Sequence, residues 1–181
     1  MTDARKQTVR LDKDGRPVGF LALENERAVT KYEVVEDGIA VITLMRPEKL
    51  NAFDEQMIRE MRTLIWQANF DDAVRVLIIT GAGRAFCAGR DIAGLDFENN
   101  LNTAGYRAYV RANHELFDDM ENLEKPIICA VNGIAAGGGV EMAVACDFLI
   151  ASTKASFLLP ENQLGVLPAS GACSRMIQMI G

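Results

Sequence analysis

A run of three glycines inside an apolar segment limits the fold of this chain more than any other feature. Gly137 to Gly139 follow "KPIICAVNGIAA" and lead directly into "VEMAVACD". Glycine lowers helix stability, and a carboxylate such as that of Glu141 is unfavourable in a buried position. The segment therefore predicts a buried strand, a tight turn, and a buried helix with an acidic side chain in its first turn.

Short apolar runs alternate with amphipathic segments along much of the chain. Residues 31–45 predict a hairpin with its turn at Asp37-Gly38. Apolar residues at helical spacing predict helices over 54–68, whose first residue is a suitable N-cap, and over 103–123. Further buried strands are expected in "VRVLIIT", "KPIICAV" and "DFLIAS". Strands followed by helices in this order indicate an α/β layered domain whose loops at strand ends carry the function.

Composition narrows the class of protein. With 181 residues, of which 49% are hydrophobic, the chain is long enough for one domain with a substantial core. A net charge of -6 disfavours a nucleic-acid or anionic-membrane surface, and no apolar run reaches the length of a membrane span. Four cysteines without a CxxC pair and the single histidine, His114, provide little for a metal site. We expect a cytoplasmic protein with reduced thiols.

The first 30 residues differ from the rest. Residues 1–30 are charged and irregular, apart from "VRLDKDGRPVGFLALE", which has the pattern of an added hairpin around an Asp-Gly turn. We interpret them as an N-terminal extension and residues 31–181 as the functional core.

Two glycine-rich segments follow two predicted buried strands: "GAGRAFCAGRD" after "RVLIIT", and "NGIAAGGGVE" after "IICAV". Loops at the same ends of neighbouring parallel strands converge on one crevice, where backbone N–H groups and a helix N-terminus favour an oxyanion. Each segment alone is more often a simple tight turn. Phosphate is a weaker alternative, because neither segment has the spacing of a P-loop or a complete dinucleotide fingerprint.

Two glutamates occur in otherwise apolar text. Glu141 lies just inside the predicted helix, and Glu161 follows a proline in "FLLPENQLGVLPASG". Taken singly, the first suits a helix N-terminus and the second a solvent-exposed loop. If both enter one site, repulsion and desolvation separate their pKa values, so that one can act as an acid and the other as a base. Paired carboxylates beside an oxyanion hole suit proton transfer next to a carbonyl.

Four segments resemble one known family. "ITLMRPEKLNAF", "GRAFCAGRDI", "KPIICAVNGIAAGGGVEMAVACD" and "FLLPENQLGVLPASG", in this order and spacing, resemble the enoyl-CoA hydratase/isomerase (crotonase) superfamily. The resemblance covers residues 31–181 and implies a crotonase-like ββα spiral core of stacked sheets with surrounding helices. It implies an acyl-CoA thioester as substrate and no cofactor, since coenzyme A is part of that substrate.

The resemblance also implies roles for individual positions. Two backbone N–H groups, of Arg90 and Gly138, would form the oxyanion hole for the enolate of the thioester. The arginine side chain is not needed there and is expected to meet a CoA phosphate or solvent. The edge that binds CoA and substrate would consist of Lys49, Leu50, Ala88, Asp91, Ile92 and Ala93.

Hydratases of the superfamily use two glutamates at the positions of Glu141 and Glu161. One would activate water for attack at C3, and the other would exchange a proton at C2, which implies reversible hydration by a lyase. Isomerases often keep only the carboxylate that corresponds to Glu161. The aromatic and apolar residues of 103–123 would line the acyl pocket or belong to the core, and His114 is assigned no catalytic role.

The chain also departs from the family. It has "FLLPE" and "PASGACSR" where many hydratases have FGxPE and GAGGTQR, so Leu158, Ala169 and Ser170 alter the surroundings of Glu161 and the next helix. It ends before the helices through which relatives usually form trimers or hexamers, so we expect its apolar surface to need self-association. An enoyl-CoA isomerase, an acyl-CoA hydrolase and a non-catalytic acyl-CoA-binding protein remain as alternatives to a hydratase.

Overall fold

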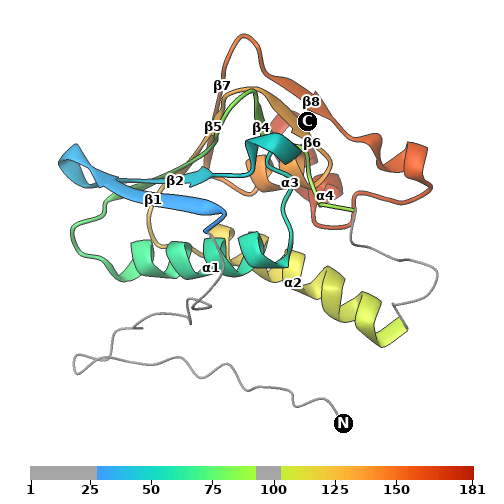
Figure 1. Cartoon of the computed structure of the whole chain (residues 1–181), viewed down its shortest axis with the longest axis horizontal. Coiled ribbons are helices and arrows are strands. Elements are labelled where there is room, and N and C mark those ends of the chain that lie inside the picture. Colours follow the sequence, from blue (N-terminus) through green and yellow to red (C-terminus); the bar gives the residue numbers. More distant parts are fainter. Residues whose placement is uncertain (1–27, 93–102) are drawn as a thin grey trace.

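The strands form two sheets that lie against each other. The computed structural model describes residues 28–92 and 103–181 (Figure 1). The larger sheet has the strand order β1-β2-β3-β5-β7, and the smaller has the order β4-β6-β8. The strands of the larger sheet are β1 (Thr30–Val35), β2 (Ile39–Leu44), β3 (Val76–Gly81), β5 (Ile127–Val131) and β7 (Phe148–Ala151). Those of the smaller sheet are β4 (Ala85–Cys87), β6 (Ile134–Ala136) and β8 (Ser156–Leu158).

The chain visits the two sheets alternately. Strands β3, β5 and β7 are parallel neighbours in the larger sheet, and each is followed by a strand of the smaller parallel sheet. Helix α2 (Thr103–Glu121) follows the first strand pair, and α3 (Gly138–Val144) follows the second. The repeated order of two strands and a helix is the predicted ββα spiral of stacked sheets, and the α/β fold class is thus confirmed.

The hairpin at the start of the core matches the sequence prediction. Strands β1 and β2 pair antiparallel, with Thr30 opposite Leu44 and Val35 opposite Ile39. The turn between them is the short 3₁₀ helix η1 (Glu36–Gly38), in which Asp37 and Gly38 both have positive φ. Residues 1–27, with the predicted hairpin of the N-terminal extension, lie outside the described residues.

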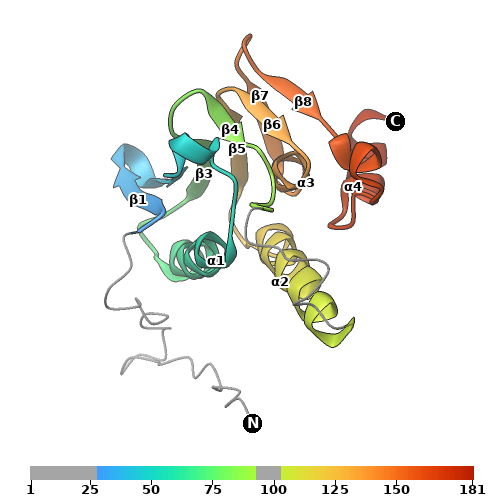
Figure 2. The same ribbon diagram turned by 45° about the vertical axis from the view of Figure 1, so that its right-hand side comes forward.

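Two helices cover one face of the larger sheet. In Figures 1 and 2, α1 (Glu55–Phe70) and α2 lie beneath the sheet, while α4 (Ala172–Ile180) lies beside α3. The predicted N-cap is confirmed, since the Oδ1 atom of Asp54 accepts a hydrogen bond of 3.0 Å from the N–H of Met57. Two short 3₁₀ helices, η2 (Pro47–Lys49) and η3 (Pro160–Leu164), lie within the segments "ITLMRPEKLNAF" and "FLLPENQLGVLPASG".

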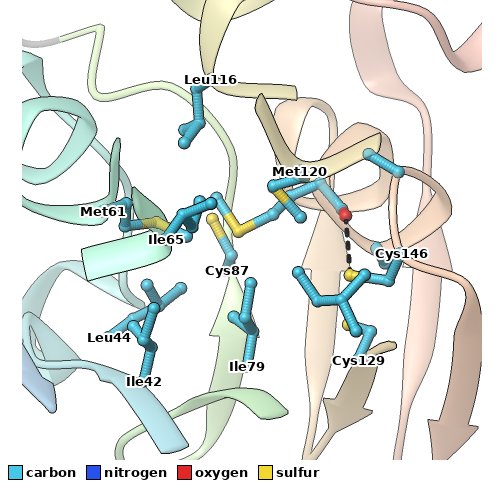
Figure 3. Close-up of a cluster of buried hydrophobic side chains, with 14 of the residues drawn as sticks. Ile42, Leu44, Met61, Ile65, Ile79, Cys87, Leu116, Met120, Cys129 and Cys146 are labelled. Carbon is cyan, nitrogen blue, oxygen red and sulfur yellow. Dashed lines mark hydrogen bonds between the residues drawn. The ribbon is translucent and has the colours of Figure 1, made fainter. Parts of the chain in front are cut away.

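The core fills the space between these helices and the larger sheet. Ile42 of β2 lies beside Ile79 of β3, which in turn lies beside Cys129 of β5. All three are fully buried, as are Met61 of α1 and Leu116 of α2 (Figure 3). Alternate residues of each central strand thus face the helices, and one apolar layer holds the strands in the register that the site requires.

The two glycine-rich segments are not simple loops. The sequence analysis treated 81–91 and 132–141 as loops, but β4 and β6 lie within them and pair with each other in parallel. Both strands have three residues, and every residue of β4 is buried. Strands this short and this buried lack the alternation of polar and apolar residues from which a strand is normally predicted.

Asn51 ties the turn after β2 to the start of the smaller sheet. It is fully buried and has a positive φ of 56°. Its Nδ2 donates to the carbonyl oxygens of Ala82 and Ala85 at 2.8 and 2.9 Å, and its Oδ1 accepts from the N–H of Arg46 at 3.0 Å. One side chain thereby bonds to three buried or partly buried backbone groups.

We predict that Asn51→Ala lowers the free energy of unfolding by about 3 kcal/mol, because two of these backbone groups lose this partner, while the Ala85 carbonyl keeps only a bond of 3.3 Å from Asn132. Asn122→Ala is the control, since the side chain of Asn122 makes one exposed bond, to Asp118, and its loss should cost less than about 0.5 kcal/mol. Urea unfolding of the two variants checks the difference. Equal stabilities would show that Asn51 does not anchor the turn.

The described part of the chain contains no helix long and apolar enough to cross a membrane. Its four cysteines are free thiols, and three of them, Cys87, Cys129 and Cys146, are buried. The Cys146 thiol donates to the carbonyl oxygen of Met142 (Figure 3).

Candidate active site

The two glycine-rich segments meet where the sequence predicts that they converge. Gly89 follows β4 and has a φ of 91°, and Gly138 is the first residue of α3. A Cβ atom on Gly89 would lie 3.1 Å from the amide nitrogen of Gly138 and 2.7 Å from the carbonyl oxygen of Ala136. Only glycine fits this contact, so the two backbones approach as closely as a shared site requires.

The triple glycine lets α3 begin against β4. A Cβ atom on Gly139 would lie 2.1 Å from the carbonyl oxygen of Cys87, and one on Gly138 would lie 2.6 Å from the Cζ atom of Phe53. Gly137 precedes the helix with a φ of 52°. As the first helical residue, Gly138 has no carbonyl within the helix to accept from its N–H. This amide can therefore donate to a ligand.

Glu141 is buried in the first turn of α3. Only 4% of the residue is exposed, and its Oε1 accepts bonds from the N–H groups of Ser170 at 2.7 Å and Ala172 at 3.3 Å. Desolvation by burial is the largest influence and raises the pKa of this carboxyl, the two N–H donors lower it, and the charge of Glu161 raises it. The net result is a raised pKa, as expected of an acid-base group.

We predict that Glu141→Gln stabilises the fold at neutral pH. Because the pKa in the folded state is raised above 4.5, this carboxyl contributes stability that is full below pH 4.5 and is lost as pH rises through the raised value. Glutamine does not ionise, so the variant avoids this loss of stability. The free energy of unfolding at neutral pH should rise by about 1.4 kcal/mol for each unit by which folding raises the pKa of Glu141.

Urea unfolding at about pH 4 and at neutral pH measures the difference, with Glu124→Gln on an exposed side chain as control. The variant should gain on wild type only at the higher pH. An equal gain at both values would mean that the ionised carboxylate is not the cause.

Glu161 lies in η3, beside the triple glycine. Its Oε1 would be 3.1 Å from a Cβ atom placed on Gly137. Its Oε2 is buried and, among the residues that the structure describes, has no hydrogen-bond partner. A buried carboxylate oxygen without a partner is unfavourable unless a ligand supplies one. The solvent-exposed alternative for Glu161 is therefore not what the structure has, since the residue is half-buried.

The predicted CoA edge consists of two segments that run side by side. The N–H of Ala88 donates to the carbonyl oxygen of Leu50, and the N–H of Asp91 donates to that of Phe53, both at 2.9 Å. The Oδ2 of Asp91 accepts from Lys49 at 3.0 Å and from Arg46 at 2.9 Å. These contacts bring together the predicted positions on 49–50 and 88–91.

The remaining positions of this edge differ in what the structure describes. Ile92 is 57% exposed beside Asp91. Ala93 lies outside the described residues.

The side chain of Arg90 does not extend into solvent as expected. Its Nη1 donates to the Oδ1 of Asn113 on α2 at 2.5 Å, and its guanidinium lies 5.9 Å from the centre of the Phe53 ring. In the described structure Asn113 and an aromatic face hold this side chain against the protein, and its contact with a CoA phosphate stays a prediction.

Sequence reasoning also missed the contacts of three residues around Glu141. Ser170 is buried and provides one of the two N–H donors to Glu141. His114 lies on α2 with its Nε2 atom 2.6 Å from the carbonyl oxygen of Ala169. Arg175 of α4 donates from Nη1 to the carbonyl oxygen of Ser170 at 2.7 Å. The sequence signal for this loop is its departure, "PASGACSR", from the family pattern.

Within residues 28–92 and 103–181, no group of three or more His, Cys, Asp or Glu side chains is placed to hold a metal ion. The chemistry offered by the described site is that of two carboxylates and backbone N–H groups. Such an arrangement suits proton transfer beside a carbonyl whose oxygen becomes negative in the transition state.

Comparison with known sequences gives a consistent assignment. Residues 34–181 match the family described as "Enoyl-CoA hydratase/isomerase". The chain is 40% identical over 147 residues to "Crotonyl-CoA hydratase" of Syntrophomonas wolfei, with 81% of this chain and 55% of that protein covered. It is 38% identical over 142 residues to "1,2-epoxyphenylacetyl-CoA isomerase" of Escherichia coli, with 76% and 53% covered. The chain thus spans about half the length of the curated relatives it matches.

Solved structures give the same result. An enoyl-CoA hydratase from Bacillus anthracis superposes with a TM-score of 0.78 at 34% identity, over 85% of this chain and 59% of that chain. AtuE of Pseudomonas aeruginosa superposes with a TM-score of 0.79 at 32% identity, over 85% and 59%. The family match extends over more than half of the chain and includes all the described site residues. The chain belongs to the enoyl-CoA hydratase/isomerase (crotonase) family.

Proposed function

We propose that this chain forms the core of an enoyl-CoA hydratase, a lyase that reversibly adds water across the C2–C3 double bond of an enoyl-CoA thioester. The observation that carries the proposal is the pair of carboxylates at the junction of Gly89 and Gly138. Glu141 has a raised pKa, and Glu161 has a buried oxygen that accepts no bond from the described residues. Isomerases of the superfamily often keep only one of the two carboxylates, so the presence of both favours hydration.

The backbone at the glycine junction would bind the thioester carbonyl. In this proposal the N–H groups of Arg90 and Gly138 donate to the carbonyl oxygen, and they stabilise the enolate that forms when C3 is attacked. The close approach of Gly89 to Gly138 supports this, because it brings the two chain segments within reach of one oxygen atom. Lys49, Leu50, Ala88, Asp91, Ile92 and Ala93 would border the CoA moiety. No cofactor beyond this part of the substrate is required.

The two carboxylates would act on adjacent carbon atoms. C2 is bonded to the thioester carbonyl carbon, so the carboxylate nearer the carbonyl-binding amides should serve C2. We assign this part to Glu161, whose Oε1 lies beside Gly137, the residue before Gly138, and which would deliver the proton to C2. Glu141, one helical turn beyond Gly138, would take the proton from the water that attacks C3. In this proposal both groups act on the same face of the double bond, which gives syn addition.

The proposal also includes the cellular location and the oligomeric state of the enzyme. Four free thiols suit a cytoplasmic enzyme, and we place its reaction in fatty acid metabolism. Several large apolar side chains are exposed towards the C-terminal end, including Ile150, Leu167 and Ile180 at 63%, 80% and 70%. We propose that such a surface is covered in a homo-oligomer, a trimer or hexamer.

Mass spectrometry of the products from a panel of enoyl-CoA thioesters tests the proposal, with crotonyl-CoA as the first probe. A gain of one water on an intact thioester is the expected result. An isomerase would shift the double bond without a change in mass, and the relative named 1,2-epoxyphenylacetyl-CoA isomerase makes this the second candidate. Release of free CoA would indicate a hydrolase. Binding without any product would contradict the enzymatic role and favour an acyl-CoA-binding protein.

A further inference from the structure

One peptide group connects His114 to Glu141. The carbonyl oxygen of Ala169 lies 2.6 Å from the Nε2 atom of His114. The N–H of Ser170, which belongs to the same peptide group, donates to the Oε1 of Glu141 at 2.7 Å. In a planar trans peptide the C=O and N–H bonds point in opposite directions. His114 and Glu141 therefore form hydrogen bonds to opposite sides of this peptide group.

The direction of the histidine contact follows from the chemistry of its partner. A carbonyl oxygen only accepts, so the Nε2 atom of His114 must carry the proton that it donates. A donor on the carbonyl polarises the peptide group and strengthens its N–H as a donor to the next acceptor. The bond from His114 to Ala169 therefore strengthens the hydrogen bond that Ser170 donates to Glu141.

A second anchor holds the same loop independently. Arg175 donates from Nη1 to the carbonyl oxygen of Ser170 at 2.7 Å, and its Nε and Nη2 donate to Glu121 on α2 at 2.6 and 2.7 Å. The loop is thus attached to α2 both through His114 and through Arg175. Because the second attachment survives, loss of the histidine should change the orientation of the peptide without releasing the loop.

We propose that His114 is a positioning residue for Glu141, which it holds in the orientation of a base through the peptide group of Ala169 and Ser170. The effect of His114 on catalysis rests on the proposed function, but the hydrogen bonds that link His114 to Glu141 do not. The charged groups that influence Glu141 also include Glu161 and Arg175, and neither is altered by a change at His114.

Three variants test the proposal in the full chain: His114→Ala, which removes the donor; His114→Gln, whose amide can still donate; and Arg111→Ala, an exposed control on the same helix. His114→Ala should lower kcat about three- to tenfold, the loss expected for one neutral hydrogen bond, with little change in KM. His114→Gln should recover most of this loss, and Arg111→Ala should retain wild-type kcat.

The second readout needs no turnover. The Glu141 carboxyl, followed by carbon NMR in the free protein, should titrate at higher pH in His114→Ala than in wild type, because the Ser170 N–H that favours its ionised form becomes a weaker donor. A wild-type titration in that variant would overturn the proposal. The two proposals can also fail separately. If the Glu141 titration shifts in His114→Ala but the wild-type protein hydrates no thioester, the proposed function is refuted and the positioning role of His114 is retained.

Discussion

Replacement of Glu161 by glutamine should abolish most of the hydration activity while leaving the fold intact. Glutamine has nearly the same shape, but it cannot deliver a proton to C2. General acid-base groups contribute about 10²- to 10⁴-fold to a rate, and we expect kcat to fall by about this factor. Initial rates with crotonyl-CoA, together with a circular dichroism spectrum, provide the measurement.

The matched control for this variant is Glu124→Gln, a change of the same kind at an exposed position. It should retain the wild-type rate. Hydration at wild-type rate by Glu161→Gln would refute the role given to this residue. The reaction would then need another proton donor or would depend on Glu141 alone.

Gly89→Ala should damage both the fold and the site. A Cβ atom would lie 2.7 Å from the carbonyl oxygen of Ala136 and 3.1 Å from the amide nitrogen of Gly138, in a backbone conformation with φ of 91°. The positive φ costs a non-glycine residue about 1–2 kcal/mol, and overpacking costs about 1–3 kcal/mol more. We expect the free energy of unfolding to fall by about 2–5 kcal/mol and the activity of the folded fraction to fall with it.

Gly165→Ala separates the two contributions. Gly165 also has a positive φ, of 70°, but a Cβ atom there would meet nothing within 4 Å. It should cost only the backbone term of about 1 kcal/mol. Urea unfolding and activity measured on both variants give the comparison. Equal losses in the two variants would show that the close approach of Gly89 to Gly138 has no energetic importance.

The fold class could be predicted from the sequence because most of its signals are local. Asp54 sits directly before apolar residues at helical spacing, and Asp37-Gly38 separates two apolar runs, so α1 and the first hairpin were predicted correctly. Strands β4 and β6 were not, since each is three residues long and is stabilised by its partner in the smaller sheet. A strand of this kind depends on tertiary pairing and has no local pattern.

The convergence of the two glycine-rich segments was predicted, and the side-chain contacts around them were not. Convergence of the two glycine-rich segments followed from the rule for parallel strands, and the structure places Gly89 against Gly138 as expected. The contact of Arg90 with Asn113 and that of His114 with Ala169 join residues 23 and 55 positions apart. No spacing along the chain indicates which side chain of α2 meets which loop. Both contacts depend on how the helix packs against the sheet.

The most direct test of the proposed two-carboxylate mechanism follows the C2 protons of 3-hydroxybutyryl-CoA in D₂O by proton NMR. The wild-type chain should exchange one C2 proton with solvent as the thioester is dehydrated and rehydrated, and Glu161→Gln should slow this exchange by about a hundredfold or more. Exchange at the wild-type rate in the variant would contradict the account. So would a wild-type chain that binds the thioester and exchanges no proton.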